Sequence, residues 1–213
     1  MDFGSNIGYE LPNAYDHRPN WGPSDFDIRN VLVVNYVWNI PYTGGANRLA
    51  RGAFGNWQIS GLTQAQTGEP FSVSTGNDYA GVGPGSGTQL WETIHTPTTP
   101  HQFSKTQGSN YWFDTTAFVA PAAGTFAPRG TRNSLYSPGF QSWNIALVKD
   151  FHVIPNHENH MVTFRAESFN FTNHPNLDTP QTNPTSGTFG EVTGKGNTYA
   201  SERQFQFSLR YQF

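Results

Sequence analysis

The chain contains no cysteine, which excludes a disulfide scaffold, a thiolate metal site and a cysteine nucleophile. Charged residues make up only 13% of the 213 residues, about half of the roughly 25% that is usual. The net charge of −3 excludes a disordered acidic tail, and the 12 basic residues are too few for a nucleic-acid groove. No run of about 18 apolar residues occurs, so no helix is expected to span a bilayer.

Aromatic residues and turn formers are abundant instead. The chain has 17 Phe, 9 Tyr, 6 Trp, 22 Gly and 15 Pro, a composition that favours short strands joined by polar loops over helices. A membrane barrel fits this composition because its strands are short and apolar on one face only. Residues 1–6 carry neither the basic segment nor the apolar core of a signal peptide. We therefore expect either a cytosolic protein or a part of something longer.

Five segments alternate between two kinds of side chain with the period of a β-strand. In the clearest, every second residue from Phe205 to Phe213 is apolar and the residues between them are polar. Such a strand suits the edge of a soluble sandwich or, as we prefer, an outer-membrane strand with its apolar face towards lipid. In the third segment Lys149 interrupts the apolar face. The expected strands lie near residues 29–39, 57–67, 143–151, 161–171 and 203–213.

The connections between these strands alternate in length. Residues 40–56 and 152–160 form the shorter ones, and residues 68–142 and 172–202 form the long ones. A compact soluble domain seldom has such long loops without secondary structure, whereas outer-membrane barrels combine short periplasmic turns with long extracellular loops. We therefore predict an all-β fold of antiparallel up-and-down strands with both long loops outside the cell.

Five strands are fewer than the eight or more that close a membrane barrel. Unpaired strand edges in lipid cost several kcal/mol for each unsatisfied backbone group. Three outcomes therefore stay open: the strands complete a larger barrel, several copies of the chain assemble, or the chain folds as a soluble protein.

Several stretches resemble one family when they are taken in order. They are residues 22–41, 55–73, 112–151, 164–180, 189–194 and 203–213. Together they resemble the C-terminal part of TonB-dependent outer-membrane receptors of the Oar-like type, which carry a carboxypeptidase-regulatory-like domain at the N-terminus. The most specific stretches are NSLYSPGFQSWNIALVKDF and FRAESFNFTNHPN.

This resemblance implies a transmembrane barrel of about 22 strands with an N-terminal plug, of which this chain is the C-terminal part. The plug, the energy-coupling box and the signal peptide are absent from residues 1–213. The implied location is the bacterial outer membrane. The implied partners are outer-membrane lipid, the barrel-assembly machinery and, only through the missing N-terminal part, the TonB system. No cofactor is expected.

The terminal strand also resembles the C-terminal signal that the barrel-assembly machinery reads. The residues of this signal are Gln206, Phe207, Leu209, Tyr211 and Phe213. An aromatic amphipathic strand can pair with an exposed sheet edge through its backbone. Ordinary packing against lipid with an interfacial aromatic girdle explains the same residues, and both roles can hold together.

Three charged residues, Arg165, Glu167 and Arg210, are expected on the lumen side of neighbouring strands. They could guide solutes through a pore. A structural ion-pair network in a polar interior is the simpler interpretation, and we prefer it.

The first long loop offers residues that could contact a ligand, such as a sugar stacked on aromatic rings. They are Trp91, His95, His101, Tyr111 and Trp112. Aromatic residues at a membrane interface produce the same pattern, and we prefer that interpretation.

No metal site is predicted, because the spacing of His152, His157 and His160 matches no recognised ligand motif. No GxSxG elbow is present, and Asp25 and Asp27 are interpreted as turn formers, so no enzyme activity is expected. The alternative is a soluble β-sandwich or small barrel that binds or hydrolyses polysaccharide through loop carboxylates.

Overall fold

The computed structural model describes residues 13, 15–45, 47–83, 89–97, 111–153, 160–196 and 202–213. The chain divides into two compact units. The sheet unit comprises Asn30–Gln66, Phe140–Asn176 and Asn197–Phe213, and the loop unit comprises Met1–Arg29, Thr67–Gly139 and Leu177–Gly196.

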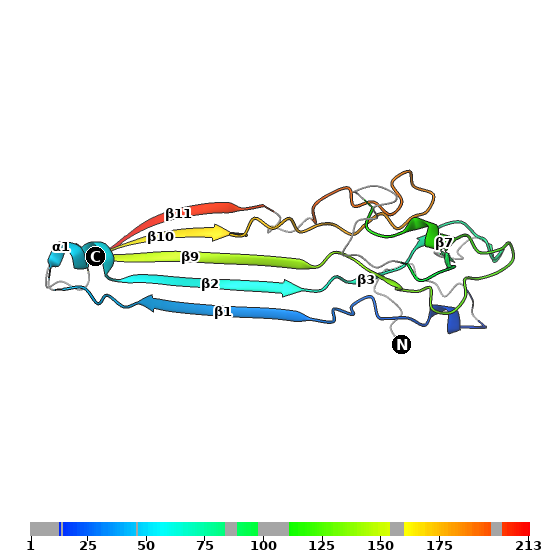
Figure 1. Ribbon diagram of the computed structural model, residues 1–213, viewed down its shortest axis with the longest axis horizontal. Coiled ribbons are helices and arrows are strands. Elements are labelled where there is room, and N and C mark those ends of the chain that lie inside the picture. Colours follow the sequence, from blue (N-terminus) through cyan, green and yellow to red (C-terminus); the bar gives the residue numbers. More distant parts are fainter. Residues whose placement is uncertain are drawn as a thin grey trace. The chain divides into compact units, whose positions relative to one another are not determined.

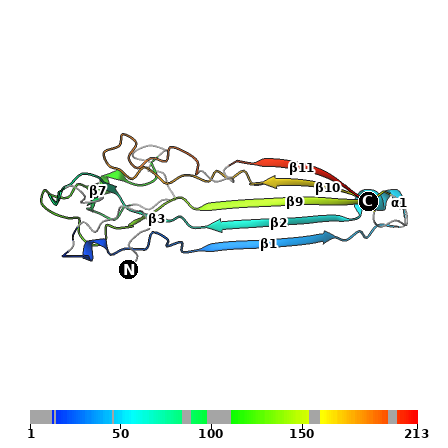
Figure 2. The ribbon, with the colours of Figure 1, turned by 180° about the vertical axis from the view of Figure 1, so that it is seen from behind.

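The sheet unit is a five-stranded sheet whose strands lie side by side in Figures 1 and 2. Every neighbouring pair is antiparallel, so the predicted all-β, up-and-down fold is confirmed. The sheet is open, with its first and last strands at the two edges. In spatial order the strands are β1 (Val31–Ile40), β2 (Trp57–Gln66), β9 (Phe140–His152), β10 (Met161–Phe169) and β11 (Gln204–Gln212).

The strand pairing fixes where the connections leave the sheet. Gln66 pairs with Phe140, and Phe169 pairs with Gln204, so both long connections leave from one end. The segment between β1 and β2 and the turn between β9 and β10 leave from the opposite end. In both views the C-terminus lies at this second end.

Directly opposed residues point to the same side of a sheet, so the pairing sorts the side chains into two faces. We call one the apolar face. It carries Leu32, Val34, Tyr36, Trp38, Trp57, Ile59, Trp143, Ile145, Leu147, Phe151, Val162, Phe164, Phe205, Phe207, Leu209 and Tyr211. Its side chains are exposed on β11, where Phe207 and Leu209 are 67% and 73% accessible. A soluble sandwich would bury these residues.

The opposite face is largely polar, and we call it the polar face. Amide, hydroxyl and charged side chains recur along it from β2 to β11. They include Gln58, Ser60, Gln64, Ser142, Asn144, Asp150, Thr163, Arg165, Glu167, Gln206, Ser208 and Arg210. Apolar side chains such as Leu62 and Val148 also lie on this face. They are most frequent on β1, where Val31, Val33 and Val37 make the second face largely apolar.

The loop unit contains short two-stranded ladders and its own hydrophobic core. The ladders pair β3 (Pro70–Phe71) with β8 (Leu135–Tyr136), β4 (Ser74–Thr75) with β5 (Gln89–Leu90), and β6 (Glu92–Thr93) with β7 (Phe118–Val119). The loop unit also contains two short 3₁₀ helices among its described residues, η1 (Arg18–Asn20) and η2 (Thr115–Ala117).

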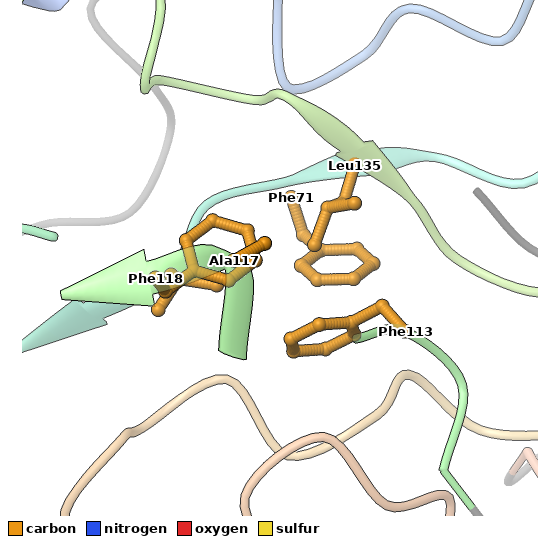
Figure 3. Packing of buried hydrophobic residues seen from close by; sticks show 6 residues of the cluster. Phe71, Phe113, Ala117, Phe118 and Leu135 are labelled. Carbon is orange, nitrogen blue, oxygen red and sulfur yellow. The ribbon is translucent and has the colours of Figure 1, made fainter. Parts of the chain in front are cut away.

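Phe113 is a fully buried residue of this core, and Figure 3 shows its ring beside that of Phe71. Its ring centroid lies 5.7 Å from that of Phe71, 5.6 Å from Phe118 and 5.5 Å from Phe189. Tilted and edge-on aromatic pairs at these distances stabilise a core beyond the area that they bury. The described parts of the long loops, in which the sequence shows no strong pattern, therefore contain packed segments.

One short helix, α1 (Arg48–Phe54), belongs to the sheet unit and connects β1 to β2. Asn47 caps it, because the Asn47 side chain accepts a hydrogen bond of 3.0 Å from the backbone N–H of Leu49. Among the residues that the structure describes, no helix has the length and apolar composition needed to cross a membrane.

Candidate lumen and membrane surfaces

Two of the three expected lumen residues form an ion pair on the polar face. Arg165 and Glu167 lie two residues apart on β10, and the Arg165 Nη2 atom lies 2.6 Å from Glu167 Oε1. Arg210 shares this face on β11, directly opposite Thr163. Thr163 in turn donates a hydrogen bond of 2.7 Å to Asp150 on β9. A row of hydrogen-bonding groups therefore crosses three strands.

An open groove of about 380 Å³ runs across the middle of the sheet. Its polar-face lining combines amide, hydroxyl and charged side chains with apolar ones: Asn35, Ser60, Asn144, Arg165 and Glu167 are polar, and Val37, Leu62, Ala146 and Phe169 are apolar. The polar groups of this mixed lining are neutral amides and hydroxyls beside one paired cation and anion. They supply no strong net charge to select ions.

The terminal strand presents its expected signal residues on both faces. Phe207, Leu209 and Tyr211 point to the apolar face, and Gln206 lies opposite Glu167 on the polar face. The ring of Phe207 stacks on Phe164 of β10, with 6.4 Å between centroids. Because β11 is an edge strand of this sheet, its outer backbone groups are available for pairing.

Aromatic side chains gather at the end of the apolar face where the chain terminates. The rings of Tyr211 and Phe213 stack with 5.8 Å between centroids. The ring of His160 stacks on Tyr211, and its Nδ1 lies 2.8 Å from the Tyr211 hydroxyl. Trp57 and Phe151 complete what we call the aromatic belt. Trp and Tyr favour such positions at membrane–water interfaces.

Lys149, a charged residue on the apolar face, is covered by this belt. Its Nζ atom lies 5.5 Å from the centre of the Trp57 ring and 5.1 Å from that of Phe151. It also donates a hydrogen bond to the backbone carbonyl of Gly55. The Lys149 side chain is buried as a result. Two aromatic faces and a carbonyl stabilise a cation that an apolar surface would otherwise exclude.

The expected ligand-contacting residues of the first long loop lie in different environments. Trp91 and Trp112 pack against the hydrophobic core of the loop unit, and the Trp112 indole donates a hydrogen bond of 2.8 Å to the Tyr136 carbonyl. Tyr111 forms a β-bridge with Glu191. His95 is exposed and contacts the neighbouring Thr96 carbonyl. His101 lies outside the described residues. Their ligand-contacting role stays a prediction.

The histidines near the β9–β10 turn form no metal site that the structure can describe. Val153 donates a backbone hydrogen bond to the His160 carbonyl, beyond the last ladder pair of His152 with Met161. His157 lies outside the described residues. Within the described ranges, no three His, Asp or Glu side chains converge as metal ligands would.

A polar network around Asp25 was missed from the sequence. Asp25 accepts hydrogen bonds from Asn133, at 2.6 Å, and from Arg132, at 3.2 Å. Asn133 also donates to the Pro23 carbonyl and bonds the Ser72 hydroxyl. The network connects the segment before β1 to the segment before β8. The turn SDFD and the motif RNS, 107 residues apart, gave no signal of this pairing.

Asp27 makes a second connection beside the first. The Tyr136 hydroxyl donates a hydrogen bond of 3.0 Å to Asp27, and the Arg29 guanidinium lies over the Tyr136 ring, 4.4 Å from its centroid. Burial and the hydrogen bond to Asp27 raise the pKa of Tyr136 above its ordinary value. The phenol therefore stays protonated and able to donate across the physiological pH range.

The comparisons with known proteins agree with this geometry. Residues 1–206 match the family model described as an outer membrane beta barrel domain. No curated protein and no solved structure matches the chain. The matched span covers the loop unit and almost all of the sheet unit. The chain therefore belongs to the outer membrane beta barrel domain family and is an outer-membrane β-barrel protein.

Proposed function

We propose that this chain forms part of the wall of a TonB-dependent receptor barrel. The apolar face meets lipid, the polar face meets the lumen, and the loop unit lies outside the cell. The observation that carries this proposal is the separation of polar from apolar side chains across the paired strands. The stretches that resemble these receptors, 112–151 and 164–180 among them, support the finer assignment.

The polar face suits a passage for hydrophilic solutes. Its groove is lined in part by amides, hydroxyls and the Arg165–Glu167 ion pair, which lie beside apolar side chains such as Leu62 and Phe169. Because the two charges compensate each other at 2.6 Å, we assign them to the stability of the wall. We expect Glu167→Gln to change unfolding more than solute selectivity.

We further propose that β11 is the strand that the barrel-assembly machinery reads. Its exposed edge and its alternating aromatic residues fit recognition by strand addition. Deleting Phe213 is expected to lower the amount of assembled barrel in the outer membrane, whereas Gln212→Ala is the matched control. Equal assembly of both variants would count against this role.

Transport itself is tested in the bacterium that produces the protein. Deleting Gln204–Phe213 from the gene should abolish the barrel and growth on one nutrient in a panel of metal chelates and oligosaccharides. Removal of TonB should abolish growth on the same nutrient. If every nutrient still supports growth after the strand deletion, or if the affected nutrient does not depend on TonB, the receptor assignment is wrong. We propose no catalytic role for this chain.

A further inference from the structure

The helix α1 is amphipathic despite its short length. A period of 3.6 residues places Leu49, Ala50, Ala53 and Phe54 on one side and Arg51 and Gly52 on the other. The apolar side is not packed on the protein, because Leu49 is 84% and Phe54 68% accessible.

Local contacts hold this helix in place although seven residues are too few for a stable isolated helix. Asn47 caps its first turn, and the backbone N–H of Gly55 bonds the Arg51 carbonyl at 2.9 Å. The Trp57 indole donates a hydrogen bond of 3.0 Å to the Ala53 carbonyl. The exposure of Leu49 and Phe54 is therefore a fixed feature of the surface.

The helix continues the aromatic belt. Trp57, which holds the C-terminal turn of α1, is the first residue of β2 and also packs on the Lys149 ammonium. Figure 1 shows α1 at the same end of the sheet as the C-terminus. The helix α1 therefore lies at the end of the sheet that carries the aromatic belt, and its Ala53 carbonyl is in direct contact with Trp57 of that belt.

The charge of this segment is of one sign. Residues 41–56 contain two arginines and no acidic residue. An amphipathic helix with basic residues on its polar side binds in the interface plane of membranes, and anionic lipids strengthen that binding.

We propose that α1 is an interfacial anchor for anionic phospholipid: Leu49 and Phe54 enter the acyl boundary, and Arg51 contacts lipid phosphate. This inference rests on the proposed placement of the apolar face in lipid. It adds a membrane-docking surface at the end of the sheet where the β1–β2 and β9–β10 connections lie. The partner is the periplasmic leaflet of the outer membrane.

The absence of cysteine makes the test direct, because a single introduced cysteine carries the only label. An environment-sensitive fluorophore is attached at Leu49→Cys in the full chain, reconstituted in phosphatidylcholine vesicles with and without phosphatidylglycerol. Spin-labelled lipids quench the fluorescence of a probe that lies in the bilayer. A second chain labelled at Leu209→Cys reports whether the apolar face of β11 is in lipid.

The Leu49 probe should be quenched by lipids that carry the spin label near the headgroup, and more strongly when phosphatidylglycerol is present. Arg51→Gln should lower the ratio of inserted to water-exposed probe about fivefold in the anionic vesicles, from about 1 kcal/mol for each basic residue. Arg51→Lys should restore it, and Arg18→Gln in the loop unit is the matched control.

A quenched Leu209 probe with a Leu49 probe that stays in water would overturn this inference and leave the proposed function intact. Quenching at Leu49 that does not depend on phosphatidylglycerol would also overturn it. If a protein partner shields the Leu49 probe instead and lipid does not quench it, the surface is a protein-docking site and the inference is wrong. If neither probe is quenched, the proposed function itself fails.

Discussion

The side chain of Tyr36 on β1 lies over Gly61, its directly opposed partner on β2. An added Cβ at position 61 would meet the Tyr36 ring and would lie 2.6 Å from the Asn144 carbonyl oxygen of the next strand. An aromatic ring above a strand glycine covers backbone that has no side chain of its own. This pair therefore explains why Tyr36 is half-buried on a strand whose other side chains are mostly exposed.

Removal of this ring should destabilise the sheet. We expect Tyr36→Ala to lower the free energy of unfolding by about 1 kcal/mol, the scale of a cross-strand aromatic pair. Tyr36→Phe keeps the ring and should have little effect. Gly61→Ala should destabilise as well, because its methyl group has no room. Denaturant unfolding in lipid vesicles measures all three, and a neutral Tyr36→Ala variant would contradict the proposed covering role.

The aromatic cover of Lys149 predicts an energetic coupling. Trp57→Ala should destabilise the fold because it removes a ring that covers the ammonium group, and Lys149→Met should remove most of that sensitivity. We expect a coupling of about 1 kcal/mol in the double-mutant cycle, within the range of cation–π pairs. Leu32→Ala, on the same face but near the other end of the sheet, should show no coupling to Lys149. Additive effects of Trp57→Ala and Lys149→Met on the free energy of unfolding would contradict a cation–π interaction between the two side chains.

The Asn133 network should control the order of the loop unit. Asn133 has a positive φ of 52° and is buried, so Asn133→Ala loses the side-chain hydrogen bonds and strains the backbone. Asn133→Gly loses the side-chain hydrogen bonds without the backbone strain. A buried polar group that loses its hydrogen-bond partner costs about 1–3 kcal/mol. Both variants should therefore loosen residues 15–29 and speed their proteolysis, and Asn133→Ala should do so more than Asn133→Gly. Equal protection in both variants and the parent chain would show that the network is not needed.

The loop after β4 should loosen in acid. Asp78 accepts backbone hydrogen bonds from Gly83 at 2.7 Å, Gly81 at 2.9 Å and Val82 at 3.1 Å. The bond from Gly83 contributes most to holding the pKa of Asp78 below its ordinary value. A carboxylate with a lowered pKa stabilises the loop above its unfolded-state value, and this stability is lost as the pH falls through the folded-state value.

Hydrogen exchange of the Gly81 and Gly83 amides, compared over a pH series after correction for intrinsic rates, measures this effect. Protection should decline at acidic pH in the parent chain. In Asp78→Asn it should be weaker at neutral pH and should no longer depend on pH in the acidic range. Protection that is unchanged between the two chains would contradict the assignment to Asp78.

The strands could be predicted because a sheet repeats every two residues, and Phe205 to Phe213 display that repeat without error. On β1 the sequence could not assign the faces, since Val31 and Val33 are as apolar as Leu32 and Val34. On β1 the pairing with β2 determines which residues belong to which face. Lys149 looked like an error in the pattern because its cover comes from Trp57, a residue on another strand.

The loop core could not be predicted from a local pattern. Phe71, Phe113 and Phe189 come from three distant segments without periodicity, and only their packing brings them together. The helix α1 was missed because seven residues give too short a window for a 3.6-residue repeat. Its available signals were the capping Asn47 and the terminal Gly55.

The central claim is that alternate residues of the terminal strand face lipid and water. Single cysteines placed in turn at positions 204 to 212 of this cysteine-free chain, labelled and reconstituted in vesicles, test it directly. Quenching by spin-labelled lipid should be strong at 205, 207, 209 and 211, and attack by a water-soluble thiol reagent should be fast at 204, 206, 208, 210 and 212. Uniform quenching along the strand, or water access at Phe207 and Leu209, would contradict the account.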